Sequence, residues 1–146
     1  MVYDLSNPLH REQFKLRCNA LYKKGAIAVL SEKQFKTLSQ NSYLHVILTH
    51  FANVDGLTME YVKEQYLKRT VCPDIFIVPR YDKRLGREVE TLRSTSELTK
   101  EEMSAVIDRF LNWSALEAGI YLPSPDDREM LKYVQVENER HSKWKI

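Results

Sequence analysis

Two long runs of helical periodicity with one predicted strand pair between them constrain the fold of this chain most. Residues 43–52 and 103–116 place apolar side chains three or four positions apart, as in helices with one buried face. Between them, Ile75 to Val78 and Glu88 to Arg93 are predicted strands, joined by a basic turn that contains Gly86. The pattern predicts an α+β fold in which a short antiparallel β-hairpin sheet is flanked by helices.

The ends of the predicted helices carry residues that cap helices. Four residues can accept a hydrogen bond from a first-turn amide: Asn7, Ser39, Thr58 and Thr99. Gly25 and Gly119 are predicted C-caps, which end helices that start at Pro8 and after Thr99. Glu102 completes a capping box with Thr99.

The apolar positions predict which side of each helix is buried. For the first helix the predicted stripe is Leu9, Phe14, Cys18, Leu21 and Tyr22. For the second helix it is Tyr43, Leu44, Ile47, Leu48, Phe51 and Ala52. For the longest helix it is Met103, Val106, Ile107, Phe110, Leu111 and Leu116.

Three shorter predictions complete the fold. Ala26 to Leu30 reads as a short apolar strand, and Asp126 to Val136 as a short helix. Residues 137–146 are predicted to form a basic, mobile tail.

Composition predicts one domain over residues 1–146. A chain of 146 residues with 43% hydrophobic content can bury one ordinary core, and it contains no linker-like segment. Its 22 Lys and Arg against 20 Asp and Glu leave a net charge of +2, so a nucleic-acid surface would depend on where the charges lie. Cys18 and Cys72 are expected to be free thiols in a reducing cytoplasm, and no long apolar run points to a membrane.

The predicted hairpin is the main candidate for binding DNA. Within residues 80–93, five basic side chains stand against three acidic ones. The candidate contacts here are Arg80, Tyr81, Lys83, Arg84, Arg87 and Arg93. Basic side chains can follow a phosphate backbone while Tyr81 stacks on a base, as in single-strand binding. The alternative is a solvated hairpin with internal ion pairs.

Other candidate contacts lie at helix ends and in the tail. Lys36, Gln40 and Asn41 lie at or near the start of the second helix, where the helix dipole favours anions, although capping explains the amides equally well. Ser94 precedes the longest helix and could hold a phosphate, or could form the turn that positions Thr99. In the tail the candidates are Lys143, Trp144 and Lys145, with a frayed terminus as the alternative.

Three further residues are predicted to meet in a homodimer interface. Trp113, Tyr121 and Leu122 lie at or near the end of the longest helix. A twofold interface would remove their apolar surface from water.

No catalytic motif, cofactor motif or metal-ligand spacing is present in the sequence, so no catalytic residue, cofactor or metal is predicted. The nearest alternative is a divalent-metal-dependent nuclease that would use Asp74, Glu88 and Glu90. Nucleases of that kind usually carry a lysine where Glu90 stands. A protein-interaction module without DNA contact is a further alternative.

Two blocks of sequence resemble the NinB family of phage and prophage recombination proteins, also called Orf-type mediators. The first block is Lys36-Thr37-Leu38-Ser39-Gln40-Asn41. The second is Ser94-Thr95-Ser96, followed by a capped amphipathic helix that ends Glu117-Ala118-Gly119-Ile120. The similarity spans residues 26–123, and His45 stands where the family often has tryptophan.

The resemblance implies an α+β homodimer that acts as a recombination accessory protein, or mediator. Such a protein binds single-stranded DNA without sequence specificity. It helps a recombinase to load against a single-strand binding protein. The resemblance therefore implies three macromolecular partners: single-stranded DNA, the single-strand binding protein and the recombinase.

Overall fold

The structure, a computed structural model, describes residues 1–35 and 37–144, and for Lys143 and Trp144 it describes the backbone alone. The chain divides into two compact units, one formed by residues 1–37 and 132–146 and the other by residues 38–131. Each unit is described by itself below. The single domain expected from composition stays a prediction.

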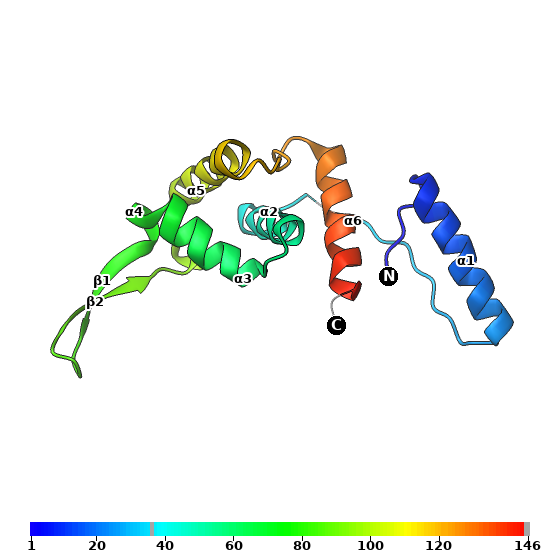
Figure 1. The fold of residues 1–146 in the computed structure, drawn as a ribbon, viewed down its shortest axis with the longest axis horizontal. Helices are drawn as coiled ribbons and strands as arrows, with labels where there is room; N and C mark the ends of the chain where they lie inside the picture. Colours follow the sequence, from blue (N-terminus) through cyan, green and yellow to red (C-terminus); the bar gives the residue numbers. More distant parts are fainter. Residues whose placement is uncertain (36, 145–146) are drawn as a thin grey trace. The chain divides into compact units, whose positions relative to one another are not determined.

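The second unit contains the predicted hairpin and the two long helices (Figure 1). In chain order its helical elements are α2 (Gln40–Asp55), α3 (Met59–Tyr61), the π-helix η1 (Val62–Val71), α4 (Pro73–Phe76), the 3₁₀-helix η2 (Thr95–Glu97), α5 (Lys100–Trp113) and the π-helix η3 (Ser114–Ala118). The strands β1 (Ile77–Asp82) and β2 (Arg87–Leu92) form one antiparallel two-stranded sheet. Six α-helices and this sheet across the described residues confirm the α+β class.

The core of the second unit lies between α2, α5 and η1. All six residues predicted as the apolar stripe of α2 are buried, which confirms that prediction. Phe51 lies at the centre, with its ring centroid 5.5 Å from that of Phe110 and 5.7 Å from those of Tyr66 and Trp113. Ring contacts of this kind add to the free energy gained by burying apolar area.

The caps that hold these helices agree with the sequence. The Ser39 side chain accepts the backbone N–H of Ser42, and Thr58 accepts that of Tyr61. Thr99 and Glu102 form the predicted capping box, and Gly119 ends the helical run with a φ of +68°.

The predicted stripe of α5 is right at its start and wrong at its end. Met103, Val106, Ile107 and Phe110 are buried, but Leu116 is 81% exposed. Leu116 lies in η3, where hydrogen bonds span five residues instead of four, and the wider turn rotates later side chains away from the α-helical stripe.

Two of the three predicted dimer contacts are packed inside the monomer. The Trp113 ring is partly buried against Phe51, Phe110 and Tyr66, and Leu122 is buried in the same core. The second unit itself covers Leu122 and part of Trp113, and the homodimer interface stays a prediction. Tyr121, the third predicted contact, directly precedes Leu122 and is exposed.

The first strand of the predicted hairpin begins two residues later than expected, at Ile77 instead of Ile75. Pro73 starts the short helix α4, and the backbone N–H groups of Ile75 and Phe76 both bond to the Cys72 carbonyl. Proline suits the first position of a helix because its missing N–H needs no partner there. Ile75 and Phe76, the first two residues of the expected strand, therefore belong to this helical turn.

The first unit contains α1 (Pro8–Lys24), which starts and ends as predicted. Its predicted apolar stripe is right only in part: Phe14, Cys18 and Leu21 are partly buried, but Leu9 and Tyr22 are exposed, and His10 is the buried residue of the helix.

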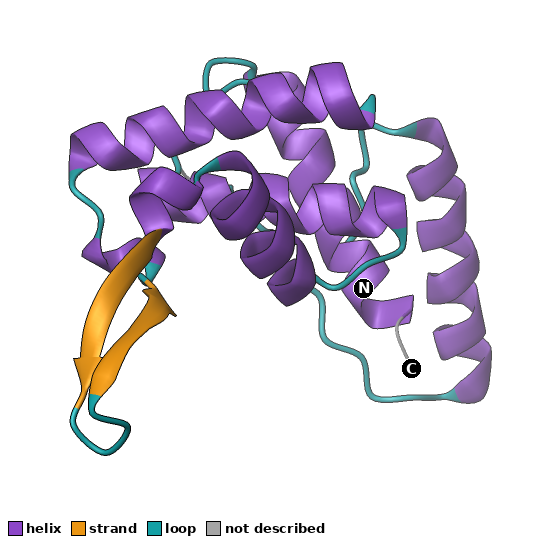
Figure 2. Cartoon of the chain, turned by 60° about the vertical axis from the view of Figure 1, so that its left-hand side comes forward, coloured by secondary structure: helices purple, strands orange, loops and turns teal. Residues whose placement is uncertain are grey.

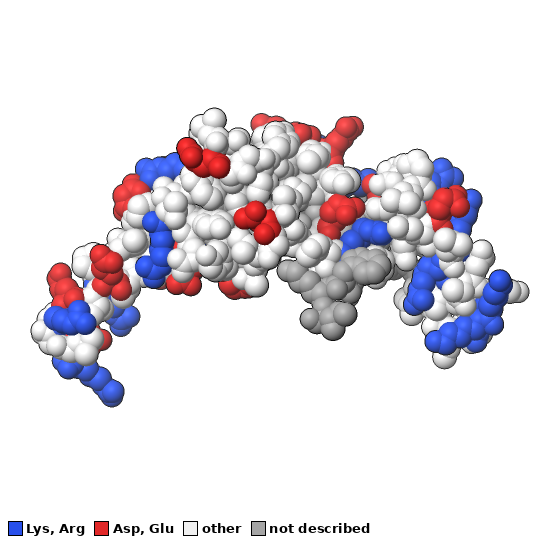
Figure 3. All heavy atoms as spheres, in the orientation of Figure 1, with Lys and Arg blue, Asp and Glu red and all other residues white. Residues whose placement is uncertain are grey.

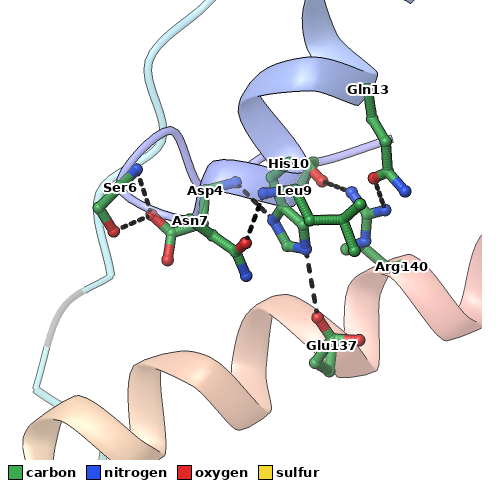
Figure 4. Close-up of polar contacts among 9 residues, drawn as sticks. Asp4, Ser6, Asn7, Leu9, His10, Gln13, Glu137 and Arg140 are labelled. Carbon is green, nitrogen blue, oxygen red and sulfur yellow. Dashed lines mark hydrogen bonds and ion pairs between the residues drawn. The ribbon is translucent and has the colours of Figure 1, made fainter.

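The polar groups of this unit explain the burial of His10 (Figure 4). Its Nδ1 accepts the backbone N–H of Asp4 at 3.0 Å, and its Nε2 lies 3.5 Å from a Glu137 carboxylate oxygen. Arg140 donates to the Val2 carbonyl at 2.9 Å and to the Gln13 side chain. Hydrogen bonds thus join α1, the first residues and the end of α6.

Two more predictions in this part of the chain are corrected. Residues 26–30 form no strand, and Ile27, Val29 and Leu30 are exposed, because no described segment pairs with them as a strand does. Most of the predicted short helix and the described part of the predicted tail form one long helix, α6 (Arg128–Trp144). The buried Arg140 accounts for part of this order.

Cys18 and Cys72 are both free cysteines, as predicted. In the part of the chain that the structure describes, no helix combines the length and the apolar character needed to cross a membrane.

Candidate nucleic-acid interface

The hairpin of β1 and β2 extends away from the helices of its unit in both ribbon views (Figure 2). Its tip is fixed by local chemistry. The Asp82 carboxylate accepts the backbone N–H groups of Arg84 at 2.9 Å and Leu85 at 3.1 Å. The Gly86 N–H donates to the Asp82 carbonyl at 2.8 Å, and Gly86 has a φ of +66°, in the left-handed region that favours glycine. Lys83 and Arg84 therefore lie at the tip of the hairpin.

The register gives the hairpin two chemically different faces. Directly opposite residues of an antiparallel pair project on the same side of the sheet. Arg80 pairs with Val89 and Asp82 with Arg87, so both arginines lie on one face. We call this the arginine face.

The other face of the hairpin is acidic. Tyr81 pairs with Glu88 and Pro79 with Glu90, so the predicted stacking residue lies beside two carboxylates. A carboxylate repels a phosphate, so a DNA strand on the arginine face would not meet Tyr81. The structure therefore brings Arg80 and Arg87 together and separates them from Tyr81.

The basic side chains of the hairpin are exposed and uncompensated. Arg80, Lys83, Arg84 and Arg87 are all exposed, and among the described residues none of them lies within 4.0 Å of a carboxylate oxygen. Figure 3 shows Lys and Arg side chains gathered over this hairpin, with acidic side chains beside them. We call these four residues the basic cluster. The alternative of a hairpin closed by internal ion pairs finds no such pair at these positions.

Arg93, predicted as a fifth contact, has a different role at the base of the hairpin. Its guanidinium makes a bidentate pair with the Glu102 carboxylate at 2.8 and 3.2 Å. It also donates to the carbonyls of Ile75 at 3.2 Å and Glu97 at 3.1 Å. Lys68 donates to the Arg93 carbonyl at 2.8 Å. These bonds fix the end of β2 to the start of α5 and occupy the Arg93 side chain.

The sequence did not identify Glu102 as the ion-pair partner of Arg93. Glu102 was expected to cap α5, which it does by accepting the Thr99 N–H at 3.1 Å. Nothing in the local pattern links it to an arginine nine positions earlier. The Arg93 guanidinium, followed by the Thr99 backbone bond, lowers the pKa of Glu102 to about 2 from an ordinary 4.5.

This pKa predicts how stability depends on acid. A carboxyl with a depressed pKa in the folded state stabilises the fold above its unfolded pKa, and this contribution is lost as the pH falls through the folded pKa. The melting temperature of wild type should therefore exceed that of Glu102→Gln at about pH 6, and the gap should close between pH 4.5 and about 2. Melting curves at several pH values measure the gap.

The control is Glu101→Gln, which changes an exposed neighbour outside this ion pair. Its melting temperature should follow wild type over the whole pH range. A gap for Glu102→Gln that stays constant down to about pH 2 would show that the carboxylate charge does not matter there.

The remaining candidates from the first and second sequence blocks lie at helix starts. Ser94 accepts the Ser96 backbone N–H and bonds to its hydroxyl, so it shapes the turn before α5, the structural alternative raised from sequence. Gln40 donates to the Ser104 hydroxyl at 2.9 Å, and Asn41 is exposed at the start of α2. Lys36 lies outside the described residues.

The tail candidates are not placed by the structure. Lys145 lies outside the described residues, and so do the side chains of Lys143 and Trp144. The basic residues of α1 that the structure describes are exposed to solvent, as a charged outer face would be.

The three carboxylates of the nuclease alternative are not arranged as one site. Asp74 pairs with Arg109 at 2.7 Å, and this hydrogen bond lowers the pKa of Asp74. Glu88 and Glu90 lie on the acidic face of the hairpin. Within residues 1–35 and 37–144, no three histidine, cysteine or acidic side chains are grouped so that they could hold a metal ion.

Comparison of the chain with protein-family models, curated proteins and solved structures finds no match.

Proposed function

We propose that this protein binds single-stranded DNA through its phosphates and that the basic cluster is the main contact surface. The observation that supports this most is that Arg80, Lys83, Arg84 and Arg87 are exposed on a projecting hairpin and form no ion pair with any residue that the structure describes. Two of them share one face and two form the tip, so a strand could run along the arginine face and over the turn. The ion pair of Arg93 with Glu102 would hold this surface in place without contacting DNA.

Binding of this kind is driven by the release of counterions. Each cation that neutralises a phosphate of single-stranded DNA contributes about −0.7 to the slope of log affinity against log salt concentration. Four contacts would give a slope of about −2.8. Because phosphates are the same in every sequence, these contacts alone carry no base specificity.

The role that we propose in the cell follows the resemblance to the NinB family. The protein would act as a recombination accessory that helps a recombinase to load on DNA covered by a single-strand binding protein. This role needs no bond-making step, and the proposed chemistry is non-covalent throughout. The experiment that tests it is binding of a labelled, unstructured oligonucleotide across a salt series. Absence of salt-dependent binding would favour an interaction module without DNA contact.

We also propose that the protein acts as a homodimer, as the resemblance implies. Leu122 is buried inside one chain, whereas Tyr121 is exposed and Trp113 is partly buried, so these last two are the predicted interface residues that could contact a second copy. Light scattering should report about twice the monomer mass of 17.2 kDa. A monomer at tens of micromolar would remove the homodimer from the proposal.

A further inference from the structure

A small pocket lies in the second unit, between the start of α2, the middle of α5 and Pro125. Its volume is about 280 Å³. Leu38, Tyr43 and Ile107 give it an apolar floor, and Gln40, Ser104 and Asp108 give it a polar rim. Tyr43 and Ile107 are buried, and the three rim residues are exposed. The pocket thus joins apolar side chains to polar groups that solvent can reach.

The rim groups offer a defined set of hydrogen bonds. The Gln40 amide donates to the Ser104 oxygen at 2.9 Å, which leaves the Ser104 O–H free to donate to a ligand. The Asp108 carboxylate can only accept, and among the described residues it has no ion-pair partner. A ligand therefore meets one donor and one strong acceptor side by side on α5.

Size and charge select the class of ligand. Pockets for drug-sized ligands usually measure about 300–1,000 Å³, so this one suits a single ring system. Its carboxylate repels phosphate but accepts from an amine, and its floor suits a flat ring. We propose that the pocket takes one unpaired, amine-bearing base of the single-stranded DNA, an inference that rests on the proposed function.

The chemistry of the bases predicts a preference. Cytosine carries an amine beside a ring nitrogen that accepts, so its amine can donate to Asp108 while Ser104 donates to the ring nitrogen. Thymine has no amine, and its ring N–H lies between two carbonyl oxygens, which the carboxylate repels. The pocket should therefore favour cytosine over thymine.

A lysine lies where a phosphate of the same strand would be expected. Lys100, Ser104 and Asp108 are spaced four residues apart, so they follow one line along α5. Lys100 is exposed at the first turn of the helix. With the base beside Asp108, the backbone of the strand can pass the Lys100 ammonium, which would add affinity without base preference.

The pocket and the hairpin lie on different sides of α5. Glu102, which holds the base of the hairpin through Arg93, precedes Ser104 by two residues, or about 200° around an α-helix. A DNA strand that uses both surfaces must pass around the helix. An oligonucleotide of about 16 nucleotides, at the upper end of the site sizes typical of single-strand binding, is therefore the suitable probe.

The experiment compares the affinities of a cytosine oligonucleotide and a thymine oligonucleotide of this length, measured by fluorescence anisotropy at one salt concentration. Wild type should bind the cytosine oligonucleotide about three- to tenfold more tightly, the ratio that corresponds to one hydrogen bond of ordinary net strength at an exposed site. Asp108→Ala should remove the preference, and Ser104→Ala should reduce it. Lys100→Ala should weaken binding of both oligonucleotides by the same factor.

The matched control is Glu101→Ala, which removes another exposed acid of α5 that does not line the pocket. It should keep the wild-type preference. Equal affinities of wild type for the two oligonucleotides, or a cytosine preference that survives in folded Asp108→Ala, would overturn the base pocket. Equal but salt-dependent binding would leave the proposed function standing, whereas no binding of either oligonucleotide would overturn both.

Discussion

Replacement of Lys83 and Arg84 together by alanine should lower the magnitude of the salt slope for oligonucleotide binding by roughly 1.4. The two side chains lie at the exposed tip of the hairpin, so each would lose one phosphate contact. Affinity should fall by the same factor for every sequence, because phosphates carry no base information. Anisotropy titrations at several salt concentrations give both quantities.

The matched control is the double variant Lys23→Ala with Lys24→Ala. It removes the same charge from exposed lysines at the end of α1, in the other unit. Its slope should stay close to that of wild type. A folded hairpin variant with unchanged affinity and slope would show that the basic cluster is only a solvated turn, and a lysine control that loses more would move the DNA surface to α1.

Phe51→Ala should reduce the free energy of unfolding by about 3–5 kcal/mol, the usual cost of removing a buried phenylalanine. Phe51 is fully buried, and its ring contacts those of Tyr66, Phe110 and Trp113. Alanine would leave a cavity, and each of these three rings would lose its contact with the Phe51 ring. Denaturant unfolding followed by circular dichroism measures the change.

The comparison for this prediction is Leu116→Ala. The helical spacing of the sequence places Leu116 in the same core, but the structure leaves it 81% exposed. Its replacement should change the unfolding free energy by no more than about 0.5 kcal/mol. A loss at Leu116 comparable to that at Phe51 would contradict the π-helical turn at η3.

Those features that depend on neighbours in the sequence could be predicted. Ser39, Thr58 and Thr99 cap helices because each side chain reaches an amide two or three residues away. Gly86 closes the hairpin because the turn needs a left-handed residue. The stripe of α2 is regular, so its buried face followed from spacing alone.

Features that depend on distant parts of the chain could not be predicted. The spacing rule failed at Leu116 because a π-helical turn changes the number of residues per turn without a sequence signal that we recognised. The sequence does not distinguish Arg93 from its basic neighbours, because its partner Glu102 comes within hydrogen-bond distance only in the folded structure. The pairing of Gln40 with Ser104 joins residues 64 positions apart, so the pocket could not be read from either helix by itself.

The sheet of this protein has only two strands, so each strand is also an edge. An edge strand with unpaired backbone groups invites another chain to add to it, which leads to aggregation. Pro79 lacks a backbone N–H, and the exposed charges of Arg80, Glu88 and Glu90 would meet like charges in a parallel stack of hairpins. If copies bind side by side along one DNA strand, as the proposed function implies, their hairpins should therefore resist pairing with one another.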